Sequence, residues 1–227
     1  MLKQFLTDTW YFFKNHLVAI SMIVLPIVIP VEILSTIYRQ NYTGEEFVLA
    51  EQLPPLLLGF VVYPIYTAGI VFYLHSVIVG KGLNAQSAWL LGVRFWFPYV
   101  LLSMMMGAAI IFGIFLFILP GIFFAIRFAF AEFDLLLNRT SPADAMKNSW
   151  ALTKDYMWVI LGGYVIITLI LFTPYYVIAK LLDPTNAYSP LLDTTANIVY
   201  AVLEVSYMIF AFRIYDHARK HLSPSSA

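Results

Sequence analysis

Cysteine is absent from this chain of 227 residues, and charge is scarce. Without cysteine there can be no disulfide, no thiolate nucleophile and no cysteine-ligated metal, and the redox compartment is left open. Charged residues make up 11% of the chain, whereas soluble domains carry roughly 25%. The formal net charge is zero, which argues against the basic surface of a nucleic-acid-binding protein. These absences disfavour a soluble domain and a nucleic-acid partner.

Six long apolar runs take up most of the chain, and the charges lie almost entirely between them. About 20 apolar residues cross the hydrocarbon layer of a bilayer as a helix, and continuous rather than alternating apolar runs exclude barrel strands. We therefore predict an all-α polytopic membrane protein, a single integral membrane domain over residues 1–227. The expected transmembrane helices are Leu17–Ile37, Pro55–Val79, Phe97–Leu119, Gly121–Leu137, Met157–Leu181 and Ala196–Arg213.

The Lys and Arg residues near the ends of these runs indicate an orientation. Ten of them flank one side, whereas the other side has only Arg39 and Lys180. Because cytoplasmic connectors carry the excess of Lys and Arg, we expect both termini in the cytoplasm. The acids expected on the opposite side are Glu45, Glu46, Glu51, Asp183 and Asp193. Between the third and fourth runs, Pro120-Gly121 predicts a tight hairpin turn on that side.

An internal repeat appears when the cytoplasmic segments are aligned. The segments before the first and fifth runs share a Ser/Thr-Trp pair followed by Lys four residues after the Trp, and a looser copy precedes the third run. We expect three repeats, each a short interfacial amphipathic helix followed by a helical hairpin. The candidate lipid contacts of these helices are Trp10, Lys14, Trp89, Arg94, Trp150 and Lys154. An ordinary amphipathic linker explains the same pattern and is the alternative.

The third of these short helices has a recognisable start. Ser141-Pro142-Ala143-Asp144 places Ser at the N-cap, Pro at the first helical position and an acid at the third, which is close to a capping box. We therefore predict that the helix begins directly after Ser141.

The stretch from the third to the fifth run carries a pattern of its own. It contains Pro120-Gly121-Ile122, an Arg six residues after the Gly, and the segment from Ala145 through Ser149-Trp150 to Lys154. This pattern resembles the YciC family of bacterial inner-membrane proteins, and it is also similar to the membrane domain attached to some glycerophosphodiester phosphodiesterases. The resemblance implies a polytopic inner-membrane protein and supplies no catalytic residues. Phosphodiesterase activity is not implied, because the chain has no phosphodiesterase domain.

Ionisable residues inside apolar runs are functional candidates because each is costly in lipid. Arg127 and Glu204 are expected at similar depths, about 9 to 12 Å from the non-cytoplasmic side at 1.5 Å per helical residue. Glu32 is a second candidate partner for Arg127. Two interpretations stay open: an ion pair that fixes the helix arrangement, or a polar cavity for an ion, a headgroup or a small solute. A third is that Arg127 extends to the interface.

The sequence shows no phosphate-binding loop, zinc motif or nucleophile elbow. We accordingly expect no enzyme activity, no cofactor and no metal. The leading hypothesis is an envelope factor that interacts with membrane lipids or with other inner-membrane proteins. The alternative is a small transporter or channel with a polar cavity around Arg127, Glu204 and Glu32.

Overall fold

The computed structural model describes residues 1–42, 49–182 and 190–222, and within these ranges it is all-helical without strands. Five of its helices are long and apolar enough to cross a membrane. This confirms the all-α fold class and is consistent with a membrane protein, whereas the count of six spans stays a prediction. The elements are α1 (Leu2–Tyr42), α2 (Leu49–Ile78), α3 (Ala85–Arg94), α4 (Trp96–Leu116), α5 (Ile118–Arg127), α6 (Ala131–Asn138), α7 (Pro142–Leu152), η1 (Thr153–Asp155), α8 (Met157–Leu182), α9 (Pro190–Leu203) and α10 (Val205–Leu222).

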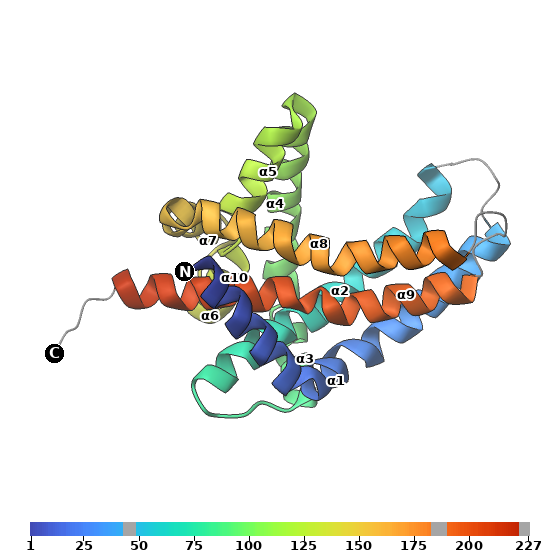
Figure 1. The fold of residues 1–227 in the computed structure, drawn as a ribbon, viewed down its shortest axis with the longest axis horizontal. Helices are drawn as coiled ribbons and strands as arrows, with labels where there is room; N and C mark the ends of the chain where they lie inside the picture. Colours follow the sequence, from blue (N-terminus) through green and yellow to red (C-terminus); the bar gives the residue numbers. More distant parts are fainter. Residues whose placement is uncertain (43–48, 183–189, 223–227) are drawn as a thin grey trace.

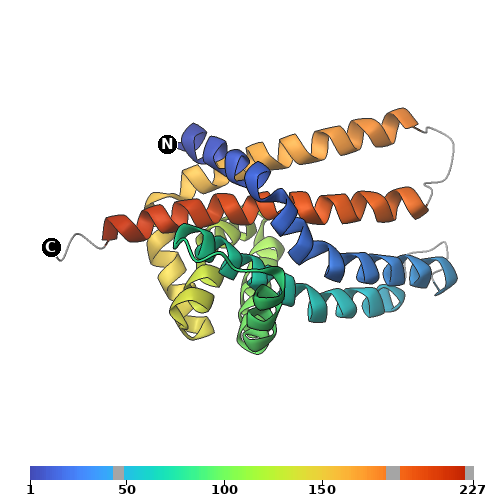
Figure 2. The ribbon, with the colours of Figure 1, turned by 90° about the horizontal axis from the view of Figure 1, so that it is seen from below.

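The long helices α1, α2, α8, α9 and α10 form a bundle along the long axis of the molecule (Figure 1). α9 and α10 follow each other nearly end to end, with Glu204 between them. The N-terminus and the C-terminal end of α10 lie at one end of the bundle in both views (Figures 1 and 2). Of the residues used to assign orientation, Glu45, Glu46 and Asp183 lie outside the described ranges.

The expected fourth span, Gly121–Leu137, is not one helix. It is divided into α5 and α6 by a turn over residues 128–130, and each part is too short to cross a bilayer. Side chains of the following helix satisfy the backbone at the break: the Ser149 hydroxyl donates to the Arg127 carbonyl oxygen at 2.8 Å and accepts from the Phe130 N–H at 3.1 Å. Thr153 donates to the same carbonyl at 3.2 Å. The break is therefore a hydrogen-bonded feature of the fold.

The expected turn at Pro120-Gly121 is also displaced. The chain reverses at Phe117, whose backbone is extended, and Pro120 and Gly121 lie in the first turn of α5. Proline fits there because the first N–H groups of a helix have no partner inside that helix. Gly121 allows α5 to approach α4 closely, since a Cβ at this position would come within 2.9 Å of the Ile114 backbone nitrogen.

The α4–α5 hairpin runs crosswise to the bundle (Figure 1). No charged residue occurs between Trp96 and Ile126, and the apolar tip is open: Phe115 is 91% exposed and Phe117 is 78% exposed. An exposed apolar surface of this kind is typical of a membrane-contacting or protein-contacting region. α4 has 21 residues and α5 has 10, so the returning helix runs back along about half of α4 before it ends at Arg127.

The three-repeat arrangement stays a prediction. α3 and α7 are separate short helices that precede α4 and α8, but the first copy is continuous with the membrane helix in α1, which bends along its length in both views. The predicted start of α7 is confirmed: Ser141 is the N-cap, Pro142 is the first helical residue, and the Ser141 hydroxyl accepts from the Asp144 N–H at 3.2 Å.

Two tryptophan indoles tie proline-containing helices together. Trp89 of α3 donates to the Ile23 carbonyl oxygen of α1 at 2.9 Å, and Trp96 of α4 donates to the Val61 carbonyl oxygen of α2 at 2.6 Å. Each carbonyl lies three residues before a proline, Pro26 in α1 and Pro64 in α2. A proline ring disturbs the preceding turn, so both indoles reinforce backbone that is weakened.

α6 lies at the centre of the packing, and its Phe133 is fully buried. In the same helix Asp134, only 4% exposed, accepts three hydrogen bonds at its carboxylate. The donors are Asn138 at 2.6 Å, Asn148 of α7 at 2.8 Å and Thr140 at 3.0 Å. This carboxylate therefore holds α6, the 139–141 connection and α7 together.

Candidate functional site

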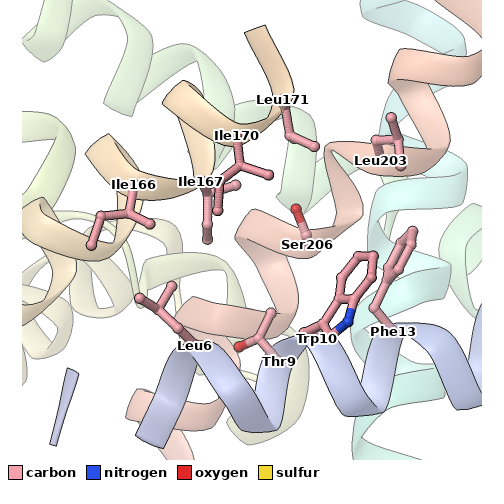
Figure 3. A pocket seen from close by; sticks show the side chains of 10 residues that line it. All are labelled: Leu6, Thr9, Trp10, Phe13, Ile166, Ile167, Ile170, Leu171, Leu203 and Ser206. Carbon is pink, nitrogen blue, oxygen red and sulfur yellow. The ribbon is translucent and has the colours of Figure 1, made fainter. Parts of the chain in front are cut away.

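An apolar pocket of about 350 Å³ lies between α1, α8 and the junction of α9 with α10. Figure 3 shows the α1 side chains facing those of α8 across the pocket, with Leu203 and Ser206 between them. This volume lies at the lower end of the range for small-molecule sites, about 300–1,000 Å³. The lining residues are Leu6, Thr9, Trp10, Phe13, Ile166, Ile167, Ile170, Leu171, Leu203 and Ser206.

Two hydroxyl groups interrupt the apolar lining. Thr9 donates to the Phe5 carbonyl oxygen of its own helix at 2.7 Å, so its hydroxyl is satisfied. The Ser206 oxygen is enclosed and has no hydrogen-bond partner among the described residues. A bound molecule would thus meet an almost entirely hydrocarbon surface, which suits an alkyl chain.

The candidate lipid contacts occupy three different environments. Trp10 is 60% exposed and lines the pocket, and Lys14 is exposed on the same face of α1, four residues later. Trp89 is half-buried and its indole is bonded to α1, as described above, whereas Arg94 is exposed.

The third Trp–cation pair is divided between the interior and the surface. Trp150 is half-buried in a group of aromatic rings formed with Phe123, Phe124 and Phe128 of the α5 segment. Lys154 is exposed. Of the three tryptophans, only Trp10 is therefore both open and adjacent to the pocket.

Arg127 and Glu204 both lie within the described residues and form no ion pair with each other. The pairing expected from the sequence is therefore absent. The Arg127 guanidinium lies over the Trp150 ring, 4.5 Å from its centroid, and 5.8 Å from that of Phe123. Glu204 instead accepts from the Tyr66 hydroxyl at 3.3 Å. The difference arises because the break after α5 directs Arg127 toward α7 rather than toward α10.

Glu32 also lies in a tyrosine-lined environment. It accepts from the Tyr63 hydroxyl at 2.8 Å and from the Asn197 amide at 3.2 Å. Tyr63 and Tyr66 contact each other edge to face with ring centroids 5.7 Å apart, so the two acids are hydrogen-bonded to neighbouring tyrosines of α2. This arrangement supplies hydrogen bonds inside the membrane and explains both acids structurally. The transporter alternative around Arg127, Glu204 and Glu32 stays a prediction.

Sequence reasoning missed Ser206, Tyr63 and Tyr66. Tyrosines are frequent in this chain, so the acids alone did not indicate which of them would donate. Tyr63 and Tyr66 are three residues apart and therefore share a helix face, which was the one available signal. Ser206 had no signal, since a lone serine in an apolar helix is unremarkable in sequence.

No family model, curated protein or solved structure matches the chain. The resemblance to the YciC family accordingly stays a prediction.

Proposed function

We propose that the protein is a non-enzymatic factor of the bacterial inner membrane that binds a membrane lipid, with an acyl chain in the pocket between α1, α8 and α10. The observation that carries this proposal is the pocket itself, an apolar space inside a set of membrane helices. Apolar cavities do not hold water stably, whereas acyl chains surround these helices and fit an apolar lining. Other inner-membrane proteins are the second class of proposed partner.

The residues beside the pocket support a lipid occupant. Trp10 is an aromatic side chain of the type enriched at membrane interfaces, and Lys14 places a cation on the same face of α1. A phospholipid whose chain entered the pocket would bring its headgroup toward such a pair. Arg94 and Lys154 are exposed cations that extend the same kind of contact to other lipids.

The proposed topology places both termini in the cytoplasm. The termini and the start of α8 lie at the same end of the bundle in both views (Figures 1 and 2). The excess of Lys and Arg assigns that end to the cytoplasm.

We expect the Ile170→Trp variant to take up less acyl chain than the wild type, because the larger ring occupies the pocket that Ile170 lines. The measurement is photo-crosslinking of the purified full chain in nanodiscs that contain a phospholipid with a diazirine in its acyl chain. Crosslinks should map to peptides of α1 and α8 and should fall by about threefold or more, since excluding even one methylene from apolar contact costs about 0.8 kcal/mol.

The matched control is Leu169→Trp. Leu169 precedes Ile170 on α8 and is similarly exposed, 59% against 62%, but it does not line the pocket. Its labelling should equal that of the wild type. Equal labelling of all three proteins, or crosslinks spread evenly over the lipid-facing helices, would exclude the pocket as a lipid site.

A further inference from the structure

Arg127 is a buried cation without an anionic partner among the described residues. Its side chain is 7% exposed, its Nε is fully enclosed and unpaired, and its guanidinium makes no hydrogen bond with any described residue. The main chain of the same residue is well satisfied, because its carbonyl accepts from Ser149 and Thr153. The fold therefore holds this residue firmly while leaving its charge uncompensated by protein.

Aromatic contacts offset only part of the cost of this burial. A cation over an aromatic face gains roughly 0.5–2 kcal/mol, and Trp150 at 4.5 Å is the nearer of the two rings. Removing an ion from water costs several kcal/mol unless it is paired and hydrogen-bonded. The guanidinium retains five N–H donors, so the site lacks an acceptor group with negative charge.

The buried acids of the neighbouring helices are already bonded to other donors. Glu132 accepts from Tyr99 at 2.7 Å, Asp134 has its three donors, and Glu204 accepts from Tyr66. No acid among the described residues forms an ion pair with Arg127, so an anion that pairs with it would come from elsewhere. The sequence placed Arg127 toward the non-cytoplasmic side, but α5 contacts η1 and α8, near the end of the bundle assigned above to the cytoplasm. At such a membrane surface, phospholipid headgroups supply phosphate groups.

We propose that Arg127 binds the phosphate group of a membrane phospholipid, with the Trp150 ring holding the guanidinium in place. A planar guanidinium matches two phosphate oxygens in a bidentate pair. Tryptophan is enriched at the headgroup level, so the stacked ring and the cation suit the same depth. This inference rests on the proposed lipid-binding function but concerns different residues from those of the acyl-chain pocket.

The test compares wild type with Arg127→Gln, Arg127→Lys and, as a matched control, Lys147→Gln. Lys147 is an exposed cation on α7, so its removal changes the net charge equally without touching the site. The full chain is purified from nanodiscs containing phosphatidylglycerol, and the phospholipid retained is counted by native mass spectrometry. A second arm adds inorganic phosphate to lipid-free protein in neutral detergent and follows the thermal unfolding midpoint.

We expect Arg127→Gln to retain about tenfold less phospholipid, in line with the loss of a charge-assisted bidentate pair. Arg127→Lys should retain an amount of phospholipid between those of the wild type and Arg127→Gln, because it keeps the charge but loses the planar guanidinium. Lys147→Gln should retain as much phospholipid as the wild type. Acyl-chain crosslinking in the pocket should be unchanged in Arg127→Gln, which separates this proposal from the proposed function.

Equal phospholipid retention by wild type and Arg127→Gln would overturn the proposal. A midpoint raised by inorganic phosphate in an Arg127-dependent manner, without retained phospholipid, would overturn the assignment to lipid and assign a soluble phosphate instead. Circular dichroism and the unfolding midpoints of both Arg127→Gln and Arg127→Lys, compared with the wild type, show whether each variant is folded, so a loss of retention by a folded variant cannot be mistaken for unfolding.

Discussion

Replacing Gly92 with alanine is expected to destabilise the protein by about 3 kcal/mol, the upper end of the usual cost of overpacking a core. Gly92 is buried where α3 crosses α2, and a Cβ there would collide with the Ile65 carbonyl oxygen and come within 3.2 Å of the Ile65 Cα. The obstacle is backbone, which cannot rotate away. The two helices also approach closely at Gly69, where a Cβ would meet the Ala88 carbonyl oxygen at 3.1 Å.

The control for this prediction is Gly107→Ala. Gly107 lies in α4, and a Cβ there would meet nothing within 4 Å. Alanine is favoured over glycine inside a helix by about 0.5–1 kcal/mol, so this variant should be neutral or slightly more stable. The measurement is the unfolding midpoint in mixed detergent micelles titrated with sodium dodecyl sulfate. A Gly92→Ala midpoint equal to that of Gly107→Ala would refute the close packing of α2 and α3.

The second large effect is expected for Asp134→Ala, which should lower the free energy of unfolding by about 3 kcal/mol or more. A hydrogen bond to a charged group contributes about 1.5–3 kcal/mol, and this carboxylate accepts three of them in a nearly closed environment. Removal also leaves the Asn148 amide and the Thr140 hydroxyl without this acceptor. We expect the connection between α6 and α7 to loosen first, detected as faster amide hydrogen exchange over residues 131–152.

Asp216→Ala is the matched control for Asp134→Ala. Asp216 forms a surface ion pair with Lys220 at 2.6 Å, and the Lys220 side chain is 68% exposed. Surface pairs contribute about 0–1 kcal/mol, so this variant should shift the midpoint little. Similar losses in the two variants would mean that the three bonds to Asp134 do not hold the helices together.

The helical membrane architecture followed from the sequence because length and hydropathy decide it. Apolar runs such as Met157–Leu181 had to be helices in lipid, and the helix cap at Ser141 could be predicted because it depends on residues adjacent in the sequence. The break after Arg127 could not be predicted, because it depends on hydrogen bonds from Ser149 and Thr153 to the Arg127 carbonyl. Hydropathy records whether a segment prefers lipid, not which side chain satisfies its backbone.

The candidate site could be predicted only in part for a related reason. The sequence singled out Arg127 and Trp150 separately, one as an intramembrane charge and the other as an interfacial ring. Their contact depends on the turn over residues 128–130 and on the connection over residues 139–141, which together bring Trp150 of α7 next to the end of α5. The acyl-chain pocket could not be predicted for the same reason, since its lining combines α1 with α8, α9 and α10 from the other end of the chain.

The indole bonds of Trp89 and Trp96 have a mechanical consequence. These donors lie in one short stretch of chain and reach α1 and α2 next to Pro26 and Pro64. The proline-containing turns of α1 and α2 are thus both hydrogen-bonded to the consecutive helices α3 and α4. We therefore expect bending of α1 and of α2 to be coupled. In bilayers of unequal thickness, we expect α1 and α2 to adjust by tilting as a rigid pair.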